Sequence, residues 1–243
     1  MITHHPHNDM LLEHTAGALS SAFSLSITAH LEMCPQCRQQ TRHFNHIGGE
    51  LLESAPTQAP LPGTFSRLLN KIEQLDAQAT RRRSGGRLPP ATTKDPVNLV
   101  APVQFAKDVS HKTSLNEPLV AEMPKVLRKL IPKDKPLHWS MLLPSTRVAH
   151  LVDEPDRDQV SLYRIARGGK IVEHNHRGLE VTLVLRGNFS DVHGMYMPGD
   201  FLVNEPGDVH KPTATQDQPC WFLLVTQARA PQNKFVNWLS KKF

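Results

Sequence analysis

The sequence predicts two domains of different fold class, an N-terminal all-α helical bundle and a C-terminal all-β domain built as a small β-barrel or jelly roll. Three observations support this prediction. Apolar residues recur at helical spacing up to about residue 80. Glycine, proline and charged residues then interrupt the pattern over residues 81–100. From about residue 136, short runs of Val, Leu, Ile and aromatic residues alternate with Gly, Pro and Asp turns, which is typical of all-β domains.

The first part of the chain, residues 8–53, is expected to form helices. Its apolar residues follow a broken helical pattern made of Met10, Leu11, Ala18, Leu19, Ala22, Phe23, Cys37, Phe44, Ile47, Leu51 and Leu52. Residues 54–63 contain three prolines. They predict an extended connector, because proline disrupts a helix interior.

A further helix is expected to begin at the N-cap candidate Thr64. It carries an apolar stripe along one side, formed by Phe65, Leu68, Leu69, Ile72 and Leu75. Two interpretations remain open. Either the stripe packs on the preceding helices, or the proline-rich connector carries it to a partner protein.

The clearest candidate strands of the C-terminal part are Val160–Ile165, Val181–Leu185, Phe201–Val203 and Trp221–Thr226. Residues 97–135 are ambiguous, although Lys125–Ile131 has the pattern of one or two helical turns. Residues 231–243 form a tail with an aromatic stripe and basic flanks. This tail predicts an amphipathic helix, either docked on the barrel or lying on a membrane surface.

The distribution of charge separates the predicted regions. The formal net charge is +5, but residues 1–79 hold four Lys/Arg and seven Asp/Glu, whereas residues 80–96 hold five and one. Much of the basic excess therefore falls in one short segment within residues 81–100, which predict a flexible basic linker rather than a nucleic-acid patch. An acidic helical part is a poor DNA-binding surface and suits a basic protein partner.

The composition also bounds the location and redox chemistry of the protein. No run reaches the roughly 18 apolar residues of a membrane span, and the first residues lack the pattern of a secretory signal. We therefore expect a cytoplasmic protein without a membrane contact. The three cysteines are two close together and one alone, so they indicate no disulfide framework.

The first strong motif is His30-x-x-x-Cys34-x-x-Cys37. His30 and Cys34 share a helix face, and Pro35 suits the first position of a new helix, which would place Cys37 in its first turn. Thiolate and imidazole side chains in this arrangement predict a zinc site, and tetrahedral zinc needs a fourth ligand. His4, His5 and His7 are the candidates, between which spacing alone does not choose.

The second strong motif runs from Gly168 to Gly187 and matches the first sequence motif of the cupin family. It supplies His174, His176 and Glu180, and the two histidines alternate along a strand so that they face the same side. His210 ends the sequence Pro206-Gly207-Asp208-Val209-His210, which resembles the second cupin motif. The gap between Gly199 and Pro206 is one residue longer than is usual in that motif. Three imidazoles and a carboxylate predict a metal site that suits Zn, Fe, Mn or Ni.

Two further residues have alternative interpretations. His193 is expected on a neighbouring strand, where it either reaches the cavity or remains an ordinary surface histidine. Cys220 precedes an apolar strand and is either a redox-responsive thiol or, more commonly for such a position, a buried side chain.

Together the two motifs resemble the zinc-binding anti-sigma factor family, in its ChrR-type branch. The resemblance rests on His4-His5-Pro6, Leu11-Leu12, Ala16-Gly17, Leu19-Ser20, Ala29-His30-Leu31, Cys34-Pro35-x-Cys37-Arg38 and the cupin motifs. It implies that residues 1–80 are a helical zinc-binding anti-sigma domain whose ligands are His5, His30, Cys34 and Cys37. It further implies that residues 101–230 are a cupin sensor domain holding a second zinc at His174, His176, Glu180 and His210.

The resemblance also implies the function. The partner would be a group IV, or extracytoplasmic-function, sigma factor, whose regions 2 and 4 are kept from polymerase. The signal for release would be oxidative stress such as singlet oxygen, and the protein would not be an enzyme.

Two other functions are compatible with parts of the sequence. One is a cupin-type metal-dependent enzyme, dioxygenase-like, with an N-terminal zinc module for assembly. The other is a DNA-binding zinc protein, which the acidic N-terminal part and the absence of a second finger-spaced Cys/His pair disfavour.

Overall fold

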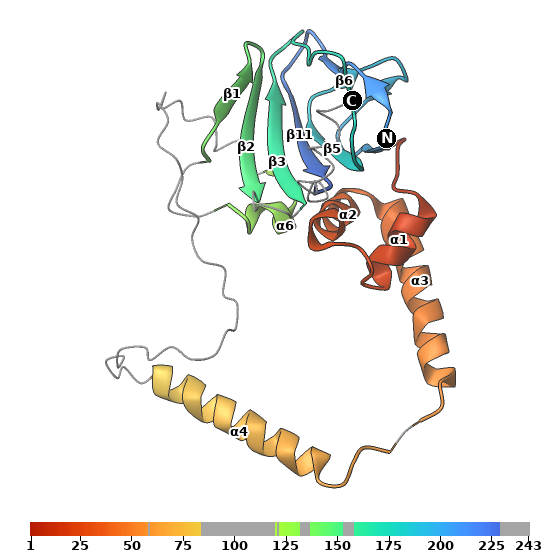
Figure 1. Ribbon diagram of the computed structural model, residues 1–243, viewed down its shortest axis with the longest axis vertical. Coiled ribbons are helices and arrows are strands. Elements are labelled where there is room, and N and C mark those ends of the chain that lie inside the picture. The colour runs from red at the N-terminus through yellow and green to blue at the C-terminus, as the bar shows by residue number, and fades with distance from the viewer. Residues whose placement is uncertain (58, 84–119, 121, 132–136, 153–157, 229–243) are drawn as a thin grey trace, which may run out of the picture. The chain divides into compact units, whose positions relative to one another are not determined.

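A computed structural model describes residues 1–57, 59–83, 120, 122–131, 137–152 and 158–228, and the side chains of residues 79–83 are not described (Figure 1). The described residues fall into two compact units, those of 1–52 together with 113–243, and those of 53–112. The predicted linker beyond residue 83 and the predicted tail at 231–243 lie outside the described residues.

Three helices begin the chain: α1 (Asn8–Thr15), α2 (Ser21–Met33) and α3 (Pro35–Ser54). α1 ends at Gly17, which adopts a left-handed φ of 70° and accommodates the helix terminus without a Cβ penalty. α2 ends at Cys34, whose extended backbone turns the chain, and Pro35 is the first residue of α3. The predicted helices and the corner between them are confirmed.

α4 (Thr64–Arg83) forms the other unit. The helix predicted to begin at Thr64 after the proline-rich connector is therefore confirmed. It ends at Arg83, a few residues beyond the helical pattern, which was expected to end at about residue 80. All five residues of its apolar stripe are exposed, from Leu69 at 42% to Phe65 at 72%. No described helix combines the length and apolarity that crossing a membrane requires.

The C-terminal part is β-rich and antiparallel. Its main sheet has the strand order β1-β2-β3-β11-β5-β8. These strands are β1 (Ser140–Leu143), β2 (Thr146–Val152), β3 (Gln159–Ile165), β5 (Glu180–Arg186), β8 (Phe201–Asn204) and β11 (Cys220–Thr226). The four strands predicted from sequence are all present, and the short helix α6 (Lys125–Arg128) lies within the segment predicted to form helical turns.

Five two-residue strands form the remaining sheets. β10 (Thr213–Ala214), β6 (Phe189–Ser190) and β7 (Met195–Tyr196) form one, and β4 (His174–Asn175) and β9 (Val209–His210) form the other. Within the described residues these three sheets do not join into a closed barrel. The expected barrel is therefore only partly confirmed, because ladders of two residues are too short to close the main sheet on itself.

The first helices and the β-rich part share one apolar core. Leu11, Phe23 and Ile27 belong to the same buried cluster as Leu183 and Phe201. Figure 1 shows α2 beside α6 and the nearby ends of the sheet strands. This packing places His30, one of the predicted zinc ligands, against Phe201 of β8.

Hydrogen bonds at two places also stabilise the contact between the N-terminal part and the rest of the same unit. The Glu32 carboxylate, near the end of α2, accepts hydrogen bonds from the backbone N–H groups of Lys125 and Val126 at 2.6 and 2.9 Å. This satisfies amides at the start of α6 that have no partner within the helix. In addition, the backbone N–H of Phe201 donates to the carbonyl of His4 at 3.0 Å.

Candidate metal centres

The N-terminal cluster consists of His5, His30, Cys34 and Cys37, each of which offers one ligand atom within 4.8 Å of the others. His5 precedes α1, His30 lies in the last turn of α2, Cys34 caps that helix, and Cys37 lies in the first turn of α3. The Nδ1 atom of His5 lies 3.5 Å from the Cys34 Sγ and 3.4 Å from the Cys37 Sγ. Two helices and an extended segment therefore converge on one point.

The structure distinguishes between the three histidines that were candidates for the fourth position. His5 joins the cluster. His4 instead lies beside Asp200, with 3.4 Å between its Nδ1 and the carboxylate, and its ring contacts Tyr196. His7 is exposed immediately before α1.

His30 is held in an orientation that suits a metal ligand. Its Nδ1–H donates to the carbonyl of Gly199 at 2.9 Å, and its ring packs on Phe201. The other ring nitrogen, Nε2, is buried and has no hydrogen-bond partner among the described residues. Burial lowers the pKa of His30 to about 4, so the imidazole is neutral and keeps a lone pair on Nε2.

The Cys37 sulfur needs a cation to ionise here. Burial and the neighbouring Cys34 sulfur raise the pKa of the Cys37 thiol to about 12. A divalent ion between the two sulfurs would reverse that shift, because a coordinated thiol loses its proton. Two thiolates and two imidazoles form a donor set that fits tetrahedral zinc.

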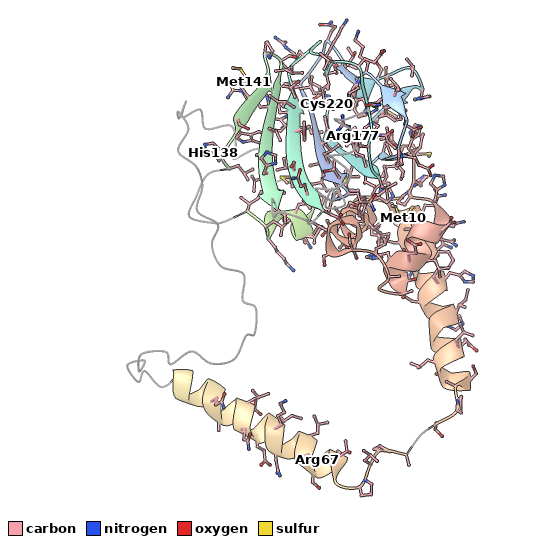
Figure 2. The ribbon with its side chains drawn as sticks, in the orientation of Figure 1. Met10, Arg67, His138, Met141, Arg177 and Cys220 are labelled. Atoms are coloured by element: carbon pink, nitrogen blue, oxygen red, sulfur yellow. The ribbon has the colours of Figure 1, made fainter. Side chains whose placement is uncertain are left out.

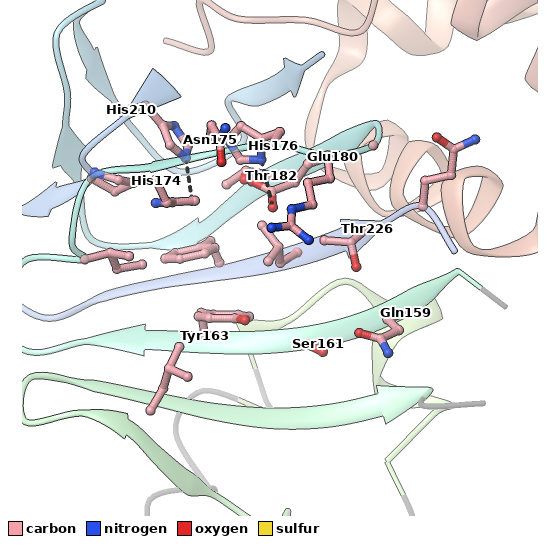
Figure 3. Close-up of a pocket in the computed structure, with 18 of the residues that line it drawn as sticks. Gln159, Ser161, Tyr163, His174, Asn175, His176, Glu180, Thr182, His210 and Thr226 are labelled. Carbon is pink, nitrogen blue, oxygen red and sulfur yellow. Dashed lines mark hydrogen bonds and ion pairs between the residues drawn. The ribbon is translucent and has the colours of Figure 1, made fainter. Parts of the chain in front are cut away.

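The second cluster consists of His174, His176, Glu180 and His210, whose ligand atoms also lie within 4.8 Å of one another (Figure 3). β4 pairs with β9 so that His174 and His210 are direct partners, and their Nε2 atoms are 3.2 Å apart. His176 directly follows β4, and Glu180 is the first residue of β5. The His176 Nδ1 lies 3.4 Å from the Glu180 carboxylate.

The titration behaviour of the second cluster also suits a cation. Burial and the imidazoles of His174 and His176 lower the pKa of His210 to about 4, and burial lowers the pKa of His176. Burial raises the pKa of Glu180 to about 7. The His176 Nε2 is buried without a hydrogen-bond partner among the described residues. Neutral imidazoles beside a carboxylate that is costly to ionise alone fit a bound metal.

Neighbouring groups orient the ligands of the second cluster. The His174 Nδ1–H donates to the carbonyl of Val172 at 2.9 Å, which leaves its Nε2 facing the cluster. The Asp191 carboxylate lies 3.6 Å from the His210 Nδ1 and accepts a hydrogen bond from the Tyr196 hydroxyl at 3.2 Å. Such outer contacts fix ring orientation in metal sites.

Sequence reasoning missed two side chains that support the clusters. Asp191 and Asp200 form these supporting contacts, as does the backbone carbonyl of Gly199, through pairings between distant parts of the chain. Gly199 has a φ of 94°, and a Cβ there would overlap the Ile2 side chain. The Pro-Gly-Asp turn at 198–200 is a weak sequence signal for such a close approach.

The remaining two candidates have structural interpretations. His193 lies exposed in the turn between β6 and β7, so its predicted position on a strand is wrong. Cys220, labelled in Figure 2, is fully buried at the start of β11. This agrees with its interpretation as a buried side chain.

Comparison with known protein families first identifies the class of the C-terminal part. Residues 128–230 match the family described as the ChrR cupin-like domain. The chain is also similar over its whole length to a particular protein, the anti-sigma-E factor ChrR of Cereibacter sphaeroides. The two are 29% identical over 242 residues, which cover 100% of this chain and 98% of that one.

A solved structure agrees in fold. The crystal structure of Rhodobacter sphaeroides SigE in complex with the anti-sigma ChrR matches with a TM-score of 0.67 and 24% identity, covering 93% of this chain and 100% of the matched chain. These similarities confirm the resemblance to ChrR-type proteins that the motifs indicated.

Proposed function

We propose that this chain is a ChrR-type anti-sigma factor that sequesters a group IV sigma factor and inhibits transcription until a stress signal releases it. The observation that carries the proposal is the similarity, over the entire chain, to a relative named as an anti-sigma factor. Residues 1–80 would bind the sigma factor, and residues 101–230 would form the sensor. The protein would act in the cytoplasm, as a regulator and not as an enzyme.

The two clusters would hold metal ions with separate roles. His5, His30, Cys34 and Cys37 would hold zinc, which supplies folding free energy to a thin helical region. His174, His176, Glu180 and His210 would hold the sensor metal. Zinc is the ion that the family implies, and the donor set also suits Fe, Mn or Ni.

Exposed apolar side chains on two separate helices would each supply a surface for the sigma factor. α3 exposes Leu51 and Leu52, and α4 exposes the stripe that begins with Phe65. Contiguous exposed apolar residues at helical spacing are typical of protein-binding surfaces. The acidic balance of residues 1–79 would complement a basic sigma surface.

Capture from a lysate of the host tests the proposal. The tagged full-length, zinc-loaded chain is expected to recover one group IV sigma factor, identified by mass spectrometry. Recovery of no sigma factor by folded, metal-loaded protein would contradict it. Turnover of a substrate by the metal-loaded chain, without a sigma partner, would favour the alternative of a cupin-type enzyme.

The α4 stripe gives a first prediction. Replacing Ile72 with Asp should weaken sigma binding by about tenfold or more, because a charge would have to be desolvated in an apolar contact. Ile72 is exposed, so the fold should be unaffected. Gln74→Asp, which adds the same charge on the same helix, is the matched control. Equal affinities of the two variants, measured by fluorescence anisotropy with the captured sigma factor, would exclude the stripe from the interface.

The sensor cluster gives a second prediction. His174→Ala removes one of the four proposed ligands, so the variant should lose the cupin metal and no longer respond to stress. It should still capture the sigma factor, because the N-terminal cluster is unchanged. Transcription of the sigma regulon under singlet oxygen and other oxidants is the measurement. Normal induction in this variant would exclude the cluster as the sensor.

A set of contacts connects the two clusters and would transmit the response. Asp191 lies between the His210 imidazole and the Tyr196 hydroxyl. The Tyr196 ring packs on His4, with 4.8 Å between ring centroids. His4 directly precedes His5, the proposed zinc ligand. A change in the cupin cluster would then alter the contact of the N-terminal segment with the β-rich part.

Tyr196→Phe tests this route because it removes only the hydroxyl that contacts Asp191. We expect the resting sigma affinity to remain near that of the wild type, while stress-induced release is reduced several-fold. Release can be followed by anisotropy on the purified complex after exposure to singlet oxygen. Unchanged release would argue for another route, such as proteolysis between the two domains.

A further inference from the structure

A cavity of about 1160 Å³ lies beside the cupin cluster, between the strands that carry its ligands and one face of the main sheet (Figure 3). Side chains from β2, β3, β5 and β11 line it, together with His174, His176, Glu180 and His210. The cluster therefore borders a space large enough for a small molecule as well as an ion.

The face of the sheet that borders the cavity is unusually polar. Strand register places His150 opposite Ser161, and Thr182 in the same cross-strand row, with Leu224 between them. The adjacent row along the same face contains Thr226 opposite Glu180. Partners in register project to one side of a sheet, and a face that only packed a core would be apolar there.

Two hydroxyl side chains belong to this polar face. Thr182 is 3% exposed as a residue and lines the cavity, and its side chain makes no hydrogen bond with any described residue. Ser161, also buried, bonds to the His150 Nδ1 at 2.9 Å. The Thr182 hydroxyl, which borders the cavity, can therefore donate a hydrogen bond to a polar group of a ligand or accept one from it.

With a divalent ion at the cupin cluster, the charge of the cavity would favour an anion. Among the described residues that line it, Arg177 is the only Lys or Arg and Glu180 the only Asp or Glu. Arg177 is exposed and forms no ion pair or hydrogen bond with the described residues, so its guanidinium can receive a ligand from solvent. A divalent ion at the cluster would add positive charge that Glu180 only partly neutralises.

We propose that this cavity binds a small carboxylate as an effector. Arg177 would pair with the carboxylate, and Thr182 would hydrogen-bond an oxygen of the ligand. A metal ion at the cluster would add positive charge beside the bound anion. The proposal rests on the metal binding proposed for the cupin cluster, and it does not depend on capture of a sigma factor.

Isothermal titration calorimetry on the full-length, zinc-loaded chain tests this, with 2-oxoglutarate as the probe and its uncharged dimethyl ester as the ligand control. We expect the acid to bind at one site and the ester not to bind. Arg177→Gln should weaken binding by about tenfold or more, and Thr182→Val by several-fold. Arg167→Gln, an exposed arginine outside the cavity lining, should bind like the wild type.

The zinc content of each sample, measured by mass spectrometry, separates ligand binding from removal of the metal. His176→Ala should lose both the cupin zinc and the binding of the acid. Three results would each overturn the proposal: no binding by the zinc-loaded chain, equal binding of acid and ester, or unchanged affinity in both Arg177→Gln and Thr182→Val. Sigma capture by the same preparations is scored separately, so failure of either proposal is distinguishable from failure of the other.

Discussion

Replacing Cys34 and Cys37 together with Ser is expected to remove the N-terminal zinc and to abolish capture of the sigma factor. Both sulfurs are buried at the corner where α2 meets α3, and they supply half of the donor set. Structural zinc in small domains contributes about 10 kcal/mol or more of apparent binding free energy, so its loss should unfold this corner. We expect sigma affinity to fall by at least about 100-fold.

Metal content and sigma affinity of the purified variant are the measurements. The cupin metal should be retained, because its ligands lie on other elements. His7→Ala is the matched control, since His7 is exposed beside α1 and outside the cluster. A double serine variant that kept both its full zinc content and its sigma affinity would show that these cysteines are not the ligands.

Asp200→Ala is expected to detach the N-terminal segment from the β-rich part. Asp200 is fully buried, and its carboxylate accepts hydrogen bonds from the backbone of Thr3 at 2.7 Å, His4 at 3.0 Å and Met197 at 2.8 Å. Removing it leaves three amides without an acceptor, at about 1–3 kcal/mol for each one that stays buried. Because His5 follows His4, zinc affinity at the first cluster should fall as well.

The pKa of the Asp200 carboxyl also predicts how the stability of the fold depends on pH. Burial alone would raise the pKa of Asp200, but the hydrogen bonds from Met197, His4 and Thr3 hold the pKa below its ordinary value. A depressed pKa in the folded state contributes stability above the unfolded pKa, and this contribution is lost as pH falls through the folded value. Wild type and Asp200→Asn should therefore differ in stability at neutral pH and converge in acid.

Chemical denaturation at several pH values, with zinc affinity measured by competition with a chelator, checks both expectations. Glu205→Ala, which removes an exposed carboxylate of the same domain, is the control and should behave like the wild type. Equal stability and zinc affinity in Asp200→Ala and Glu205→Ala would show that the Asp200 carboxylate does not hold the N-terminal segment.

Local sequence signals predicted much of the architecture. Pro35 marked the corner between α2 and α3, and the strand predicted at Val181–Leu185 is present as β5. Spacing also predicted which residues would gather in each cluster, because His-x-His on a strand and His-x-x-x-Cys on a helix place side chains on one face. These are short-range geometric constraints, which a single sequence contains.

The remainder depends on long-range contacts. The choice of His5 over His4 follows from the pairing of Thr3 and His4 with Asp200, which is nearly two hundred positions away. The sheets do not close as expected because the strands that carry ligands, such as β4 and β9, are only two residues long. No periodicity in the sequence distinguishes such a strand from a turn.

Transcription in a purified system tests the central claim, sequestration, most directly. Polymerase core, the captured sigma factor and a promoter that it recognises would be combined with increasing amounts of the zinc-loaded full-length chain. We expect transcripts to disappear as the concentration of the chain reaches that of the sigma factor, and Cys34→Ser/Cys37→Ser to have no such effect. Undiminished transcription with an excess of the metal-loaded wild type would contradict the claim.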